Sequence, residues 1–197
     1  MSAPDRIVIG ISGASGAIYG IRLLEALRAM GGVETHLVIS PAARQTIESE
    51  TDLSVKDVEA LADVVHGHRE IGATIASGSF RTRGMVVAPC SVKSLSAIAY
   101  GLADDLIGRA ADVHLKEGRP LVLLFRETPL HVGHIKAMLA ATENGAIIFP
   151  PLPAFYNRPQ TVDDIVNDTA SRVLARIGLD APVKAWAGIR AALKGEE

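Results

Sequence analysis

The chain has 197 residues, the size of one ordinary domain, and its 20 basic and 22 acidic residues leave a net charge of −2. This balance argues against a protein that binds nucleic acid or an anionic membrane surface. Hydrophobic residues make up 48% of the chain and charged residues only 21%, so we expect a sizeable core and apolar surface that a homo-oligomer would cover. A single cysteine, Cys90, excludes an internal disulfide. We expect a cytoplasmic protein, without a signal peptide or an apolar run of roughly 18 residues that could span a membrane.

The N-terminal part alternates between strand and helix patterns. Residues 6–11 form a short, continuous, β-branched run that is typical of a buried strand. Glycines then predict a turn at residues 13–16, and apolar residues recur at helical spacing from residue 18 to about residue 30. Residues 35–39 predict a second strand, and residues 42–50 predict a helix that begins just after a proline.

The rest of the chain continues this alternation. Further helices are predicted at residues 55–65, 92–100, 105–116, 131–141 and 162–177. Further strands are predicted at residues 84–88, where Pro89 ends the run, at 120–125 and at 146–149. Alternating strands and helices predict an α/β fold with one doubly wound parallel sheet covered on both faces. We expect residues 1–180 to form this single domain and residues 181–197 to form a tail, with room for a short helix at 183–193.

The glycine-rich turn at residues 10–16 is the first candidate binding site, because ligands of such sheets lie at the carboxyl ends of the strands. Gly10, Gly13 and Gly16 let the backbone approach a ligand, and Ser12 and Ser15 add hydroxyls. The helix that follows would offer unpaired N–H groups to an anion. A tight turn without a ligand is the alternative, since glycine-rich motifs also occur without one.

The spacing G-x-x-G-x-x-G favours a phosphate of a mononucleotide. A dinucleotide site would need G-x-G-x-x-G and an acid at the end of the second strand, which here ends at Ile39 and Ser40. A P-loop is excluded because Ala17, not lysine, follows Gly16. A nucleophile elbow is excluded because Ala17 stands where its second glycine is required.

Other polar residues follow later strands. Ser91 is explained by a helix cap, and a ligand contact is the alternative, while Cys90 is better explained as a small buried residue than as a nucleophile. Arg126 and Glu127 follow the strand at 120–125, where an arginine can clamp a phosphate and a glutamate can donate a proton. The alternative for both residues is that they are ordinary loop residues without a functional role.

Several basic residues and histidines are better explained without a bound ligand or metal. Arg109 and Lys116 lie seven residues apart on one helix face, which favours a solvated basic face. Histidine pairs at 66 and 68 and at 131 and 134 lack the cysteine or carboxylate partners that would complete a metal site, so no metal is expected.

Six segments together resemble the UbiX-type flavin prenyltransferases of the flavin-dependent Cys decarboxylase-like superfamily. They are GISGASGA at 10–17, PCS at 89–91, RAADVHLK at 109–116, RPLVL at 119–123, RETPL at 126–130 and FY at 155–156. Each is weak alone, but the ordered set is specific. The resemblance implies a flavodoxin-like or Rossmann-like subunit of a dodecamer, with FMN at subunit junctions and no metal.

The reaction that this resemblance implies joins a dimethylallyl group, from dimethylallyl monophosphate, to N5 and C6 of reduced FMN. The prenylated FMN then serves a UbiD-type decarboxylase, in ubiquinone synthesis or aromatic-acid degradation. Two alternatives stay open: an FMN-dependent decarboxylase of the same superfamily, and an accessory subunit of an aromatic-acid decarboxylase.

The resemblance also implies roles for individual residues. The expected FMN contacts are Gly13, Ala14, Ser15, Ser40, Ser91, Val92, Lys93, Ser94 and Arg126. Ser15 would also relay a proton beside N5, Glu127 would be the acid that assists phosphate departure, and Glu50 would be a second carboxylate near the dimethylallyl group. The residues expected at the prenyl phosphate are Arg109, Lys116, Tyr156 and Arg172. Trp186 matches an aromatic residue near the family's C-terminus.

Overall fold

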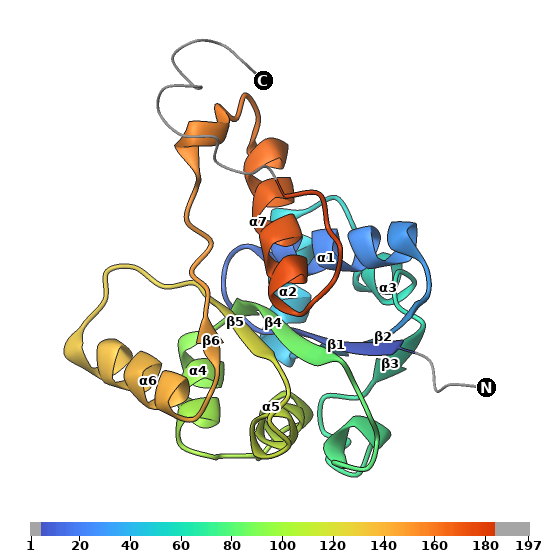
Figure 1. Cartoon of the computed structure of the whole chain (residues 1–197), viewed down its shortest axis with the longest axis vertical. Helices are drawn as coiled ribbons and strands as arrows, with labels where there is room; N and C mark the ends of the chain where they lie inside the picture. The colour runs from blue at the N-terminus through green and yellow to red at the C-terminus, as the bar shows by residue number, and fades with distance from the viewer. Residues whose placement is uncertain (1–4, 184–197) are drawn as a thin grey trace.

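Six parallel strands form one sheet in the computed structural model, which describes residues 5–183 (Figure 1). The strands are β1 (Asp5–Ile11), β2 (Val33–Ile39), β3 (Val64–His66), β4 (Gly84–Cys90), β5 (Leu121–Phe125) and β6 (Ile147–Ile148). Their order across the sheet is β3-β2-β1-β4-β5-β6, which is the order of a Rossmann fold. The prediction of an α/β, doubly wound parallel sheet is confirmed.

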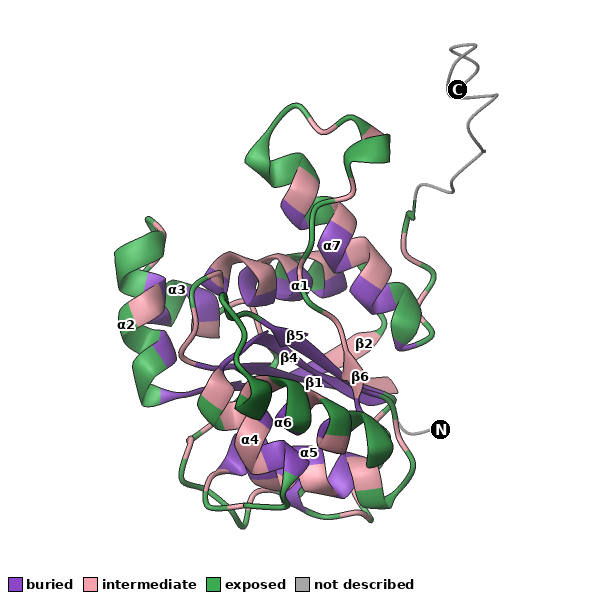
Figure 2. Ribbon diagram, turned by 90° about the vertical axis from the view of Figure 1, so that its left-hand side faces the viewer, coloured by how far each residue is buried: buried purple, intermediate pink, exposed green. Residues whose placement is uncertain are grey.

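Helices cover both faces of this sheet (Figure 2). One layer holds α1 (Ala17–Met30), α2 (Pro41–Glu50), α3 (Val55–Glu59) and α7 (Val162–Arg176), and the other holds α4 (Val92–Ala99), α5 (Leu106–Lys116) and α6 (Val132–Glu143). Short 3₁₀ turns lie at Thr74–Ala76 and Phe155–Asn157. Among residues 5–183, no helix is long and apolar enough to cross a membrane.

The central strands are apolar at almost every position because both of their faces are covered. In β1, Ile7, Ile9 and Ile11 face the layer that contains α1, whereas Val8 faces the layer that contains α5. All four side chains are fully buried. Burial on both faces explains why the sequence shows a continuous apolar run here and no alternation.

Two elements differ from their predictions. The helix predicted at 55–65 ends at Glu59, and residues 64–66 form β3, in which Val64 pairs with His36 of β2. Sheet pairing thus overrides the helical spacing of the apolar residues. Strand β4 does not end before Pro89 but continues to Cys90, and its register with β5 shifts between Val87 and Cys90. An irregular position of this kind tolerates the missing proline N–H.

His114 of α5 is an ionisable side chain inside the core, with 1% of its surface exposed. Its Nδ1 lies 2.7 Å from the Ala110 carbonyl oxygen, and its Nε2 lies 2.8 Å from the Thr82 hydroxyl. Burial is the main reason that its pKa is lowered from 6.5 to about 4. The folded protein therefore keeps this imidazole neutral.

The protein should lose stability between pH 6.5 and pH 4, because the unfolded chain protonates His114 over this range before the folded chain does. Stability is fully present above the unfolded pKa and falls by about 3 kcal/mol as the pH reaches the folded value. His114→Gln has no such proton to take up, so urea unfolding across this range should show a smaller loss. An equal loss in the variant would show that other groups cause it.

Candidate functional site

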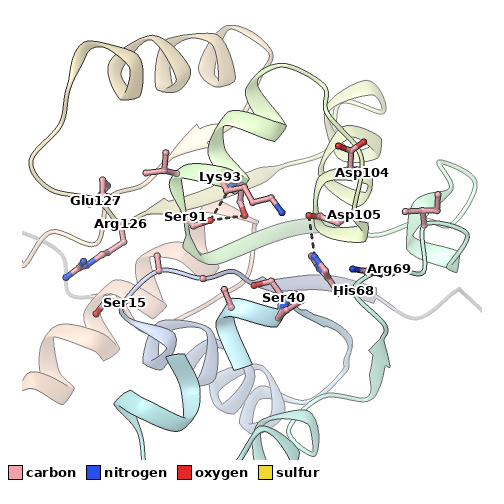
Figure 3. A pocket seen from close by; sticks show the side chains of 17 residues that line it. Ser15, Ser40, His68, Arg69, Ser91, Lys93, Asp104, Asp105, Arg126 and Glu127 are labelled. Carbon is pink, nitrogen blue, oxygen red and sulfur yellow. Dashed lines mark hydrogen bonds and ion pairs between the residues drawn. The ribbon is translucent and has the colours of Figure 1, made fainter. Parts of the chain in front are cut away.

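A cavity of about 940 Å³ opens where the carboxyl ends of the strands meet the loops that follow them (Figure 3). Its centre lies at the ends of β1 and β4, which are neighbours in the sheet although the chain builds outward from them in opposite directions. Such a switch point is where ligands bind in doubly wound folds. The lining residues are Gly13, Ala14, Ser15, Ser40, Pro41, Ala42, His68, Arg69, Ile71, Ser91, Val92, Lys93, Ser94, Asp104, Asp105, Arg126 and Glu127.

Packing and backbone conformation explain why residues 13 and 16 of the glycine-rich turn are glycines. A Cβ at Gly13 would lie 2.4 Å from the Cβ of Ala42, so only glycine lets the turn pack against the start of α2. Gly16 has a φ of 99°, a left-handed conformation that favours glycine. Ser12 does not face a ligand: its hydroxyl donates to the Pro89 carbonyl oxygen and accepts the Ser91 N–H, joining the ends of β1 and β4.

The amides at the start of α1 bind a carboxylate of the protein itself. The Glu50 carboxylate accepts the Gly16 N–H at 2.7 Å and the Ala17 N–H at 3.3 Å. This contact holds Glu50 at the end of the glycine-rich turn, although Glu50 does not line the cavity. The expectation that these amides are free for an anionic ligand is wrong, since a helix N-terminus that holds one carboxylate has lost those donors.

Two serines that line the cavity also cap helices. The Ser40 hydroxyl accepts the Ala43 N–H at the start of α2, and the Ser91 hydroxyl accepts the Ser94 N–H at the start of α4. Both helices therefore begin at the cavity with their positive dipole ends. Ser91 can therefore cap α4 and also contact a ligand, although the sequence presents these two roles as alternatives.

Three cationic side chains line the cavity: Arg69, Lys93 and Arg126. None of them has a side-chain hydrogen bond or ion pair with another residue in the range 5–183. Burial raises the pKa of the Tyr19 hydroxyl, and the positive charge of Arg126 opposes this shift. Unpaired cations on a concave surface favour an anionic ligand.

His68 and Asp105 lie at the cavity, whereas the sequence gives Asp105 no role and considers His68 only as one of a metal-binding pair. The Nε2 atom of His68 lies 3.4 Å from the Asp105 carboxylate, and its buried Nδ1 has no hydrogen-bond partner among the described residues. Burial is the main reason that the pKa of His68 is lowered, while Asp105 opposes the shift. The sequence signal that could have found them is their place after a strand and before a helix, at the ligand-binding edge.

The residues expected at the prenyl phosphate lie outside this cavity. Arg109 pairs with Asp112 at 2.8 Å, and Lys116 pairs with Glu117 at 2.8 Å. Helix α5 begins beside the cavity and has 11 residues, so Lys116 at its other end is about 15 Å farther along.

The other two expected phosphate contacts lie in the C-terminal part of the chain. The Arg172 guanidinium lies 5.5 Å from the centre of the Phe149 ring, and Tyr156 lies in the 3₁₀ turn before α7. One chain alone therefore does not bring the four residues to the cavity. Trp186 and most of the predicted tail helix lie outside the described residues.

The histidine pairs do not form metal centres in the described part of the chain. The Nε2 atom of His66 lies 2.9 Å from the Nδ1 atom of His36, and the rings of His131 and His134 stack with their centres 3.6 Å apart. Within residues 5–183, no group of three or more histidine, cysteine, aspartate or glutamate side chains could hold a metal ion.

Comparison with known proteins assigns the chain to a family. The sequence profile of the Flavoprotein family matches residues 1–174. The flavin prenyltransferase UbiX of Escherichia coli K12 is 59% identical over 177 residues, which cover 90% of this chain and 94% of that protein. The chain belongs to the UbiX flavin prenyltransferase family. The resemblance seen in its six sequence segments is confirmed.

Solved structures of UbiX-like proteins share the fold. A dodecameric FMN-dependent UbiX-like decarboxylase from Escherichia coli O157:H7 is 54% identical, with a TM-score of 0.90 over 93% of this chain and 100% of that chain. AnUbiX, solved with FMN and dimethylallyl pyrophosphate, is 49% identical, with a TM-score of 0.92 over 94% of this chain and 99% of that chain.

Proposed function

We propose that this chain is a flavin prenyltransferase that joins a dimethylallyl group, from dimethylallyl monophosphate, to N5 and C6 of reduced FMN. The observation that carries the proposal is that every residue expected at FMN, together with Glu127, lines a single cavity at the switch point of the sheet. The names of the UbiX relatives, and the FMN and dimethylallyl pyrophosphate bound to AnUbiX, support the transfer of a dimethylallyl group to FMN.

The residues of the cavity fit FMN. Its volume of about 940 Å³ lies in the range of roughly 300–1,000 Å³ that is usual for small-molecule sites. Unpaired cations are present for a phosphate, and serines and backbone groups are present for the polar edge of a ring. When bound and reduced, FMN supplies an electron-rich ring as the nucleophile. The chain then needs no nucleophile of its own, in agreement with burial raising the pKa of the Cys90 thiol.

The chain's own residues would assist departure of the prenyl phosphate. As the allylic C–O bond breaks, its electron pair leaves with the phosphate, and negative charge grows on the phosphate oxygens. Glu127 would donate a proton to this group, and the cations expected at the prenyl phosphate would stabilise its charge. Ser15 is exposed at the edge of the cavity, in the glycine-rich turn before α1. It would relay the proton that the flavin ring loses when the new bond to the dimethylallyl group forms.

We further propose a dodecamer in which neighbouring chains complete the site. Helix α6 exposes Val132, Ile135 and Leu139 by 65%, 53% and 58% on one face, as expected for a surface that another subunit covers. The separation of Lys116 from the cavity supports the same proposal, and one related protein is described as dodecameric. Mass measurement under native conditions should give twelve subunits in a fully active sample, and an active monomer would contradict it.

We also propose that the prenylated flavin is passed to a UbiD-type decarboxylase in the cytoplasm. Apo-decarboxylase mixed with this protein, FMN, a reductant and the prenyl donor should gain activity. Activity that needs only FMN, without this protein, would contradict the proposal.

A comparison of donors tests the reaction itself. Dimethylallyl monophosphate should convert reduced FMN into a new flavin, seen by chromatography, faster than the pyrophosphate does. Carbon dioxide release from a cysteine-terminated peptide, without a new flavin, would favour the decarboxylase alternative. A stable complex with a decarboxylase and an unmodified flavin would favour the accessory subunit.

A further inference from the structure

We propose that Arg69, together with Lys93, binds the phosphate of FMN and makes the protein select FMN over riboflavin. This inference rests on the proposed function, because it takes FMN as the ligand of the cavity. The sequence resemblance gives Arg69 no role.

The cavity has two chemically different ends (Figure 3). Ser15, Arg126 and Glu127 lie at one end, where the acid that assists phosphate departure is expected. Arg69 and His68 lie at the other end, beyond Ser40. A cofactor that reacts at its ring would place the ring at the first end and its phosphate away from it.

The start of α1 is not available for the phosphate. Its Gly16 and Ala17 amides already bind the Glu50 carboxylate, and a second anion there would be repelled by the first. The anion must therefore be held by other donors of the cavity. The remaining donors are the starts of α2 and α4 and the cationic side chains, and only the cationic side chains carry a full positive charge.

Arg69 and Lys93 act together at the second end. Both side chains line the cavity on the side where His68 lies in Figure 3, although they come from segments that follow different strands. The pKa of His68 is lowered mainly by burial, and the charges of Lys93 and Arg69 lower it further. Neither side chain has a hydrogen bond or ion pair within residues 5–183. Two neighbouring cations without counter-ions suit a phosphate monoester, which carries up to two negative charges.

The acids at this end do not neutralise Arg69. The Asp105 carboxylate is engaged: it accepts the Gly108 N–H at 2.9 Å and lies 3.4 Å from His68. Asp104 is exposed and lies beyond Asp105, away from Arg69, in Figure 3. The guanidinium therefore stays free for a ligand.

The segment that carries Arg69 is held in place before any ligand binds. The His68 carbonyl oxygen accepts the Leu106 N–H at 2.9 Å, which ties the segment to the start of α5. On the other side of Arg69, the Glu70 carboxylate accepts the Gly67 N–H at 2.7 Å. Because the backbone of this segment is already ordered, binding through Arg69 orders only its side chain and costs less entropy.

Binding of two flavins to Arg69→Gln tests the inference without turnover. Dissociation constants for oxidised FMN and riboflavin, measured by quenching of flavin fluorescence, compare ligands that differ only in the phosphate. We expect Arg69→Gln to weaken FMN binding about tenfold or more, since a charge-assisted hydrogen bond is lost, and to leave riboflavin binding unchanged. Lys93→Gln should show the same selectivity, and Arg69→Lys should retain part of the FMN affinity.

Lys56→Gln is the matched control, because Lys56 is an exposed cation on α3, away from the cavity lining. It should bind both flavins as the unmodified protein does. Equal weakening of FMN and riboflavin in Arg69→Gln, or no change in either, would overturn the inference. A selective loss of FMN affinity in a protein that makes no prenylated flavin would sustain this inference and reject the proposed function instead.

Discussion

Glu127→Gln is expected to abolish most prenyl transfer while FMN binding is retained. Glutamine cannot donate the carboxyl proton that assists phosphate departure, and loss of such a general acid costs about a hundredfold to ten-thousandfold in rate. The change is conservative in shape, because the Glu127 carboxylate accepts the Thr128 N–H at 2.9 Å and a glutamine carbonyl can do the same. Rates of prenylated flavin formation and FMN dissociation constants measure the two effects separately.

Glu48→Gln is the control for this prediction, since Glu48 is an exposed carboxylate on α2 that does not line the cavity. It should keep full activity. A Glu127→Gln variant with the unmodified rate would remove Glu127 from the mechanism. A variant that loses FMN affinity in parallel with rate would make Glu127 a binding residue.

Gly20→Ala is expected to destabilise the protein, although alanine is the better helix former. In an exposed helix interior this substitution gains about 1 kcal/mol. Here a Cβ would lie 2.4 Å from the Ala88 carbonyl oxygen and 2.9 Å from the Ile11 side chain. Helix α1 would have to move away from the sheet, and we expect a net loss of about 1–3 kcal/mol in the free energy of unfolding.

Gly72→Ala is the matched control for the effect of an added methyl group. A Cβ at Gly72 would meet no atom within 4 Å, and its φ does not lie in the left-handed region. Denaturant unfolding should leave this variant within about 0.5 kcal/mol of the unmodified protein. A Gly20→Ala variant that is as stable as Gly72→Ala would show that α1 does not pack against β4 as closely as described.

Local patterns in the sequence predict the elements that are apolar throughout or periodic over several turns. The strands at residues 6–11 and 35–39 and the helix that begins near residue 18 are examples, since burial on both faces leaves a clear signal. Strand β3 could not be predicted in this way. Its three residues form a strand because they pair with β2, and the local spacing of apolar residues carries no information about pairing across the sheet.

The residues of the site also divide into those that local sequence patterns predict and those that they do not. The residues expected at FMN line one cavity because each follows a strand, and parallel strands bring their carboxyl ends to one edge. Arg69 also follows a strand, but that strand was not foreseen, so neither was the residue. Gly20 was missed because its packing partner, Ala88, lies far away in the sequence. The Glu50 contact with the start of α1 could not be inferred from spacing either, since it joins residues 34 positions apart.

The mass of the flavin shows directly whether this chain carries out prenyl transfer. The purified protein is mixed under strictly anaerobic conditions with FMN, a reductant and dimethylallyl monophosphate, and the flavin is released and weighed by mass spectrometry. We expect a flavin heavier by one five-carbon dimethylallyl unit, formed only when protein, reductant and donor are all present. An unchanged FMN mass in the complete mixture would contradict this expectation.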